Sequence, residues 1–359
     1  TAAAIGRGVT TTGADDAASV DRRTVRTEGA GGLTGEMATA VIAGRTYQQI
    51  TGLNQGDNAV TINAASGTVT QVKGIHATAM EVTEILLGTG ADKFSLTDLA
   101  RAADNQNVTA MVIVQGGAGN DALTAQSVLG RQALVLYGDA EVGMAAYGAT
   151  APTGADTINV SAQKSGMIFV DGGDGSDTIV GGAGTLLAIG GAGADVLTAG
   201  AGKTTLVGDS TLRIDRSRGF ATIDTVVSVG ADRLTGGADT EVMAGDNLVT
   251  SAFDMQSVRP TTLTSTGAGG VDVIAANNTG AVILGGGGAD TITAPGARVI
   301  LGDTGTVTLT SAGVLVRAVS DSATTGGADT IRLQSGGAVV IGGIGADSIS
   351  AVGGDNFIV

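Results

Sequence analysis

The residues best suited to chemistry in this sequence are aspartates that recur at a fixed spacing. Aspartate outnumbers glutamate by 28 to 6. Short carboxylates held beside tight turns supply the oxygen ligands that Ca²⁺ prefers. The spacing therefore predicts a column of Ca²⁺ ligands along one edge of a repetitive fold. Three pairs lie 18 residues apart, each member after a glycine-rich turn: Asp177 and Asp195, Asp272 and Asp290, Asp329 and Asp347.

The elements that must position these aspartates are nonapeptide repeats. From residue 172 the chain reads GGDGSDTIV, GGAGTLLAI, GGAGADVLT, AGAGKTTLV and GDSTLRIDR, five units that keep one register. The glycines permit a tight turn, and the aliphatic residues that follow form a short strand with one side chain directed inward. A roll with two nonapeptides in each turn places residues 18 apart above one another. We expect one edge to carry the aspartates and the opposite edge to be apolar or neutral.

Further copies of the unit extend the set of candidate metal ligands. Clear copies begin at residues 116, 285, 324 and 342, and weaker ones at 87, 151 and 267. A second motif, Gly-Asp after aliphatic residues, recurs at residues 57, 139, 209, 246, 303 and 355. For the Gly-Asp aspartates, capping of a turn stays open beside metal ligation. The candidate ligands are Asp92, Asp121, Asp139, Asp156, Asp177, Asp195, Asp209, Asp272, Asp290, Asp303, Asp329 and Asp347.

The repeats resemble the G-G-x-G-x-D-x-U-x unit of the repeats-in-toxin family, the hemolysin-type calcium-binding repeats. The resemblance covers roughly residues 87–359, with interruptions, and the composite pattern is similar to very large secreted bacterial surface proteins. It implies a right-handed parallel β-roll or β-solenoid, all-β, that folds when several Ca²⁺ ions bind between its turns. It also implies type I secretion to the extracellular space or cell surface. Only alternate nonapeptides keep the aspartate, so about half of the family's possible sites are missing.

The chain leaves the nine-residue frame at intervals. Residues 304–325 alternate apolar and polar side chains around Ala312-Gly313, which predicts a β-hairpin. Residues 87–359 are therefore expected to form a calcium-binding roll with inserted hairpins or enlarged rungs. Residues 1–86 are less regular and are expected to continue the solenoid. The one predicted helix is Leu96–Ala103, and the whole is expected to be a segment of a longer repetitive chain.

Composition argues against several other classes of protein. The chain has no cysteine, which excludes disulfides and suits an extracellular protein. A formal net charge of −15 disfavours nucleic acid as a partner. No apolar run approaches the roughly 20 residues that span a bilayer. His76 is the only histidine, and Gly202-Lys203-Thr204 lacks the upstream glycine of a phosphate-binding loop. We therefore expect no enzyme active site.

These features favour an extracellular Ca²⁺-binding structural rod segment of a bacterial surface layer, fibre or large adhesin, which folds and stiffens on Ca²⁺. The open ends and long edges of a roll suggest end-to-end or lateral self-association. Two alternatives remain. One is a non-catalytic repeat module of a secreted enzyme. The other is a glycan- or ice-binding adhesin module, with threonines such as those of 306–310 exposed and a cell-surface glycan as one partner.

Overall fold

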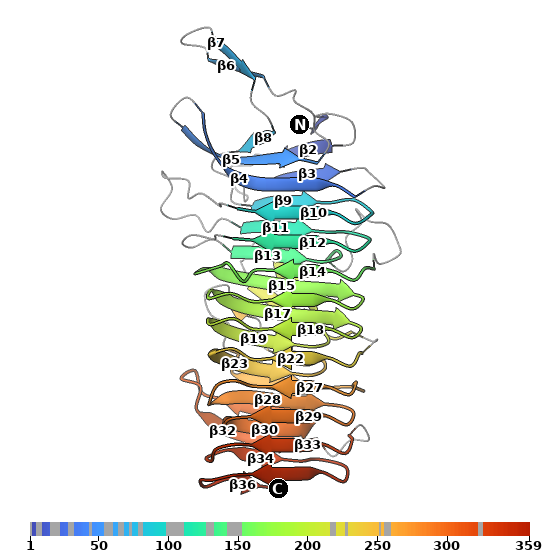
Figure 1. The fold of residues 1–359 in the computed structure, drawn as a ribbon, viewed down its shortest axis with the longest axis vertical. Helices are drawn as coiled ribbons and strands as arrows, with labels where there is room; N and C mark the ends of the chain where they lie inside the picture. Colours follow the sequence, from blue (N-terminus) through green and yellow to red (C-terminus); the bar gives the residue numbers. More distant parts are fainter. Residues whose placement is uncertain are drawn as a thin grey trace.

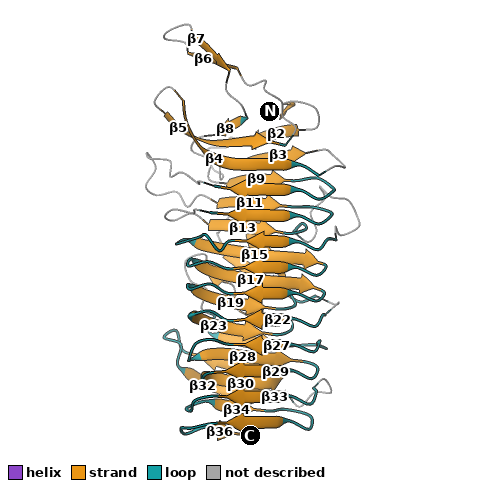
Figure 2. Cartoon of the chain, viewed as in Figure 1, coloured by secondary structure: helices purple, strands orange, loops and turns teal. Residues whose placement is uncertain are grey.

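The fold is known from a computed structural model, in which every regular element of the described residues is a β-strand (Figure 2). The all-β prediction is confirmed for this part of the chain. No helix long and apolar enough to cross a membrane occurs among these residues. The structure describes residues 2–4, 9–14, 22–27, 32–42, 45–53, 60–63, 68–71, 74–77, 82–97, 111–126, 133–141, 153–215, 220–226, 229–250, 253–254, 260–321 and 326–359.

Two long sheets, here called sheet A and sheet B, run the length of the molecule. Sheet A has 14 strands in the order β1 (Ala2–Ala4), β2 (Val9–Ala14), β3 (Arg22–Thr27), β9 (Val82–Leu86), β11 (Met111–Gln115), β13 (Ala133–Tyr137), β15 (Met167–Asp174), β17 (Thr185–Ala192), β19 (Lys203–Val207), β23 (Asp239–Ala244), β28 (Ala281–Gly286), β30 (Ala297–Asp303), β34 (Val339–Ile341) and β36 (Phe357–Ile358). Its pairs are parallel from β3 onward.

Sheet B has 13 strands in the order β35 (Ser348–Ala351), β33 (Thr330–Leu333), β29 (Thr291–Ala294), β27 (Val273–Ala275), β22 (Arg233–Thr235), β18 (Val196–Thr198), β16 (Thr178–Val180), β14 (Thr157–Asn159), β12 (Ala122–Ala125), β10 (Lys93–Leu96), β4 (Thr34–Ile42), β5 (Arg45–Gly52) and β8 (Ile75–Ala77). From β4 to β35 its pairs are parallel, whereas β4, β5 and β8 pair antiparallel.

The chain alternates between the two sheets, so each coil contributes one strand to each. Ile168 of β15 pairs with Leu186 of β17, and Ile179 of β16 pairs with Leu197 of β18, in both cases 18 residues on. The predicted stacking of residues 18 apart is therefore confirmed in this region. The coils are stacked along the long axis of the molecule, with the two ends of the chain at opposite ends (Figure 1).

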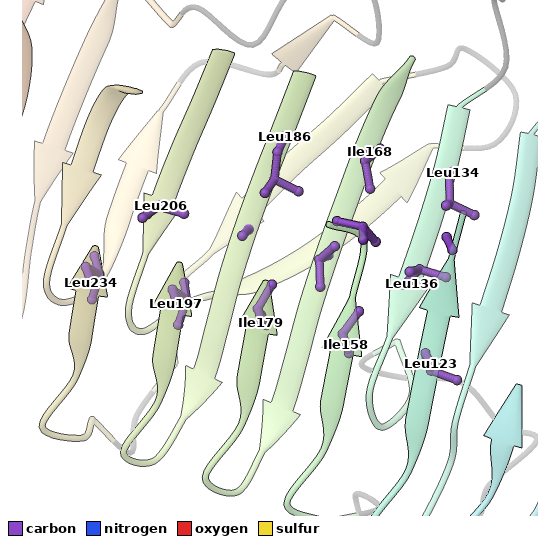
Figure 3. Packing of buried hydrophobic residues seen from close by; sticks show 14 of the residues in the cluster. Leu123, Leu134, Leu136, Ile158, Ile168, Ile179, Leu186, Leu197, Leu206 and Leu234 are labelled. Atoms are coloured by element: carbon purple, nitrogen blue, oxygen red, sulfur yellow. The ribbon is translucent and has the colours of Figure 1, made fainter. Parts of the chain in front are cut away.

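The space between the sheets is filled by small aliphatic side chains. The three-residue strands β14, β16, β18, β22 and β27 of sheet B each bury one of them at their centre, as predicted, and sheet A supplies the facing layer (Figure 3). Strand β18 shows the pattern, because Leu197 is buried while its neighbour Val196 is 40% exposed. The labelled residues are Leu123, Ile158, Ile179, Leu197 and Leu234 from sheet B and Leu134, Leu136, Ile168, Leu186 and Leu206 from sheet A.

Segments inserted between coils form two smaller sheets, here called the cover sheets. One contains β20 (Thr211–Asp215), β21 (Phe220–Asp224) and β25 (Phe253–Asp254), and the other β24 (Leu248–Thr250), β26 (Thr262–Ser265), β31 (Gly305–Leu309) and β32 (Leu315–Ser320). Their buried apolar residues join the outer face of sheet A in a second core. The antiparallel β31–β32 pair confirms the predicted hairpin. A further hairpin is β6 (Val60–Asn63) with β7 (Thr68–Gln71).

Two sequence predictions are wrong. The fifth nonapeptide does not continue the frame, because the chain leaves the coil at Ser210 and β20 pairs antiparallel with β21 in a cover sheet. The predicted helix begins at Leu96, which is instead the last residue of strand β10 and fully buried. Packing of Leu96 in the core between the sheets overrides the local helix signal. Residues 98–103 of that prediction lie outside the described residues.

Candidate functional site

The principal candidate site is a column of aspartates along the edge where sheet A strands turn into sheet B strands. The backbone N–H of each aspartate donates a hydrogen bond to Oδ1 of the next aspartate in the column, at N···O distances of 2.6–3.0 Å. Leu33 N–H makes the same bond to the first member, at 2.6 Å. This aspartate ladder comprises Asp92, Asp121, Asp156, Asp177, Asp195, Asp232, Asp272, Asp290, Asp329 and Asp347.

The first glycine of each turn makes room for the ladder carboxylate. A Cβ atom on Gly172 would lie 2.4 Å from Asp177 Oδ2 and 2.3 Å from the carbonyl oxygen of Gly190 in the next coil. The same two kinds of oxygen crowd Gly190, Gly245 and Gly302. Only glycine permits this approach, so the repeated glycine brings a carboxylate oxygen and a main-chain carbonyl oxygen to the same part of each turn.

The second carboxylate oxygen of most ladder members has no hydrogen-bond donor. It is buried, and it lies where the Cβ of any residue other than glycine would stand. A buried carboxylate oxygen without a donor or a cation is costly. The eight oxygens in this state are Oδ2 of Asp121, Asp156, Asp177, Asp195, Asp232, Asp272, Asp290 and Asp329.

Burial raises the pKa values of the ladder carboxyls from Asp92 to Asp329, and the charges of neighbouring aspartates add to the effect at most of them. The pKa rises to about 9 for Asp232 and Asp290, and to about 6 for Asp177 and Asp329. It is about 7 for Asp121 and Asp272 and about 8 for Asp156 and Asp195. At neutral pH the column therefore needs protons or cations to neutralise it.

Ca²⁺ fits the donor chemistry of this edge, because all of the available ligands are hard oxygens. Carboxylates of consecutive ladder members, such as Asp177 and Asp195, would hold the ion together with turn carbonyls such as that of Gly190. No cluster of three His, Cys, Asp or Glu side chains suited to a metal is found among the described residues. Main-chain carbonyls would therefore have to supply much of the shell.

Nine of the twelve predicted ligands lie in the ladder. The other three, Asp139, Asp209 and Asp303, lie elsewhere, at the carboxyl ends of sheet A strands or just beyond them. There they accept main-chain N–H groups, together with Asp246. The predictions missed Asp232 as a ladder member. Its signal is Gly230-Ala231-Asp232 followed by a short strand, hidden because an insertion separates it from Asp195 by 37 residues.

A second buried carboxylate, Asp171 on β15, attaches a cover sheet to the coils. Its Oδ2 accepts the N–H of Leu212 at 2.7 Å and the hydroxyl of Thr211 at 3.0 Å. Tyr137 on the neighbouring strand donates its hydroxyl to the carbonyl oxygen of Leu212 at 3.3 Å. Burial raises the pKa of Asp171 to about 7. The sequence around Asp171 does not predict this role, because the residues that donate to its carboxylate lie about 40 positions further along the chain.

The two other residues considered from the sequence, Lys203 and His76, lie in ordinary strands of sheets A and B. Lys203, in the triplet that resembles a phosphate loop, begins strand β19, and its Nζ lies 3.7 Å from Oε1 of Glu241. The backbone of His76 pairs with Gln49 in sheet B, and its side chain lies outside the described residues.

Comparisons with models of known protein families, with curated proteins and with solved structures find no match. Functional inference therefore depends on the ladder itself.

Proposed function

We propose that this chain is a non-catalytic, Ca²⁺-binding structural rod segment whose coils are held together along the aspartate ladder. The observation that carries the proposal is the repetition of a buried, donor-free carboxylate oxygen in eight successive positions. One such oxygen would be a local feature of a single turn. Eight of them along one edge mean that every one of these turns requires positive charge beside its carboxylate. Cations between coils would meet that requirement and link each coil to the next.

The other parts of the proposal follow from the sequence. Lack of cysteine and the repeats-in-toxin resemblance support an extracellular or cell-surface location reached by type I secretion. Right-handed winding is the usual sense for parallel strands joined by crossovers. The repetitive stack of coils supports end-to-end or lateral self-association into a surface layer, fibre or adhesin.

A calcium titration tests this function. The chain is treated with chelator, then titrated with Ca²⁺ while far-UV circular dichroism and isothermal titration calorimetry are recorded. We expect a cooperative gain of β signal with several ions bound per chain. Asp195→Asn should remove or weaken at least one site, whereas Asp239→Asn, at an exposed position on the same coils, should bind as the parent does. Saturation at one ion or fewer, with an unchanged spectrum, would refute the proposal.

A second candidate function is binding of a glycan or ice surface by the outward face of the larger cover sheet. There Thr262 lies opposite Thr308 and Thr264 opposite Thr306, with the last two hydroxyls 3.1 Å apart. Ice-recrystallisation and glycan-array assays on Thr264→Val would test it. Equal activity of parent and variant in both assays would exclude this face.

A further inference from the structure

The Gly-Asp aspartates occupy the place of a particular glycine in the repeated turn. In continuous turns the second glycine has a positive φ, as in Gly191 at 112°, Gly286 at 115° and Gly343 at 107°. Asp303 pairs in register with Gly286. Among the described non-glycine residues only Leu53 and Ser210 have a positive φ, so Asp303 has a backbone that leaves the turn rather than completing it.

The turn opened in this way resumes after an insertion. Residues 247–268 and 304–325, 22 in each case, follow Asp246 and Asp303. The chain then returns at Gly270 and Gly327, which stack on Gly230 and Gly288 of the preceding coils so closely that a Cβ would meet their carbonyl oxygens at 1.4 and 1.9 Å. The Gly-Asp pair and the later G-x-D are thus two halves of one turn.

The aspartate side chain reaches across the opening. Asp246 Oδ1 accepts the N–H of Gly270, where the chain returns, at 2.9 Å, and Oδ2 accepts the N–H of Gly287 in the next coil at 2.6 Å. Asp303 repeats this arrangement with the N–H groups of Gly327, at 3.0 Å, and Ile344. Each carboxylate therefore joins the departing strand, the returning strand and the following coil.

The following coil is adapted to this carboxylate. A Cβ on Gly286 would lie 2.1 Å from Asp246 Oδ2, and one on Gly343 would lie 2.1 Å from Asp303 Oδ2. A partial version occurs at Asp139, whose Oδ2 accepts Asp174 N–H at 2.7 Å, although its Oδ1 is buried without a donor like the Oδ2 atoms of the ladder. At Asp209 the next coil is itself open, so its carboxylate faces that of Asp246 and its own partner is Gly230 N–H at 3.1 Å.

We propose that Asp246 and Asp303 are insertion clamps rather than metal ligands: each stands at the place of the second glycine of a turn, lets a segment leave the coil, and holds the opened turn closed. Asp246 and Asp303 are positioning residues for the ladder aspartates Asp272 and Asp329 that follow the return. The assignment does not depend on Ca²⁺ binding. It makes each such turn a graft point for hairpins on the outer face of sheet A.

Amide exchange tests the clamp directly. In the full chain at saturating Ca²⁺, Asp246→Ala should speed exchange of the Gly270 and Gly287 amides about tenfold, since both lose their acceptor. Asp239→Ala, at an exposed position on the same coil, should leave these amides unchanged. Unchanged exchange at both glycines in Asp246→Ala, or the loss of one bound Ca²⁺ per chain in that variant, would overturn the assignment.

A reversal of sign gives a second test. Deleting 304–325 together with Asp303→Gly restores the turn GGGGAD, identical to residues 285–290. Asp303→Gly should lower the thermal midpoint in the full chain but raise it in the shortened chain, where the position again needs a positive φ. The same direction in both backgrounds would refute the proposal. If the shortened chain does not fold, the amide measurement decides.

Discussion

Sheets A and B are made from the same coils, yet they are buried to different extents. In sheet A, β28 is buried at all six positions and β17 at six of eight. In sheet B, β18 and β27 bury only the central residue of three. The cover sheets account for the difference, because they pack on the outer face of sheet A. A strand's environment in this molecule is therefore set by segments inserted in later coils as well as by its own sequence.

The largest expected effect comes from the edge that both sheets share. The raised pKa values mean that the metal-free folded chain binds protons more tightly than the unfolded chain does. Its stability should therefore be greatest near pH 4 and fall as pH rises through about 6 to 9, the range of the ladder pKa values. Thermal melts in chelator from pH 4 to 9 would measure this, with both sheets lost together. A metal-free chain most stable at pH 9 would contradict it.

The next effect separates the two sheets. Phe169→Ala removes a fully buried ring from the outer face of sheet A, and it should lower the free energy of unfolding by about 3–5 kcal/mol. Val196→Ala, on the outer face of sheet B and 40% exposed, should cost less than about 1 kcal/mol. Urea titrations of both variants measure the difference. Equal losses would mean that the cover sheets do not protect sheet A in solution.

A smaller effect is expected where a cover sheet is attached. Asp171→Ala leaves the N–H of Leu212 without its acceptor, so it should cost about 1–3 kcal/mol. Hydrogen exchange should quicken in β20 and β21 before it does in β15. The control is Asp171→Asn, which keeps one acceptor oxygen and should therefore lower the free energy of unfolding by less than Asp171→Ala does. Faster exchange throughout the coils, with no excess in β20, would show that Asp171 acts in the core instead.

The smallest effect should be on the surface of the cover. Arg213 and Asp224 form an ion pair at 3.0 Å, with side chains 56% and 48% exposed. Arg213→Ala should change the free energy of unfolding by less than about 1 kcal/mol and lose that effect in high salt. A loss as large as that of Phe169→Ala would show that the cover is held by charge rather than by apolar packing.

The coil could be predicted from sequence because its rule is local. Glycines, one aspartate and one aliphatic residue within nine positions determine the turn and the strand, so the stacking of Asp177 on Asp195 followed from counting. Asp232 was not predicted because an insertion before it interrupts the 18-residue spacing. The hairpin around Ala312-Gly313 was also local, with both strands within one alternating segment.

The cover sheets could not be predicted from local sequence rules. β26 pairs with β31, and β21 with β25, across insertions from different coils. Nothing within either segment specifies its partner until the coils bring the two side by side. The same holds for Asp303, for which the sequence left metal ligation and capping of a turn open. Its partners, Gly327 and Ile344, lie 24 and 41 residues later.

The direction of the strands has a mechanical consequence. They lie across the long axis (Figure 1), so the hydrogen bonds between successive coils run along that axis. A pulling force applied to the two ends would load these bonds along their length and open them one coil at a time, rather than shearing a whole sheet at once. The Asp N–H···Oδ1 bonds of the ladder form a seam parallel to the same force. Such a rod would lengthen in steps under tension, each step releasing the chain stored in one coil and its insertion.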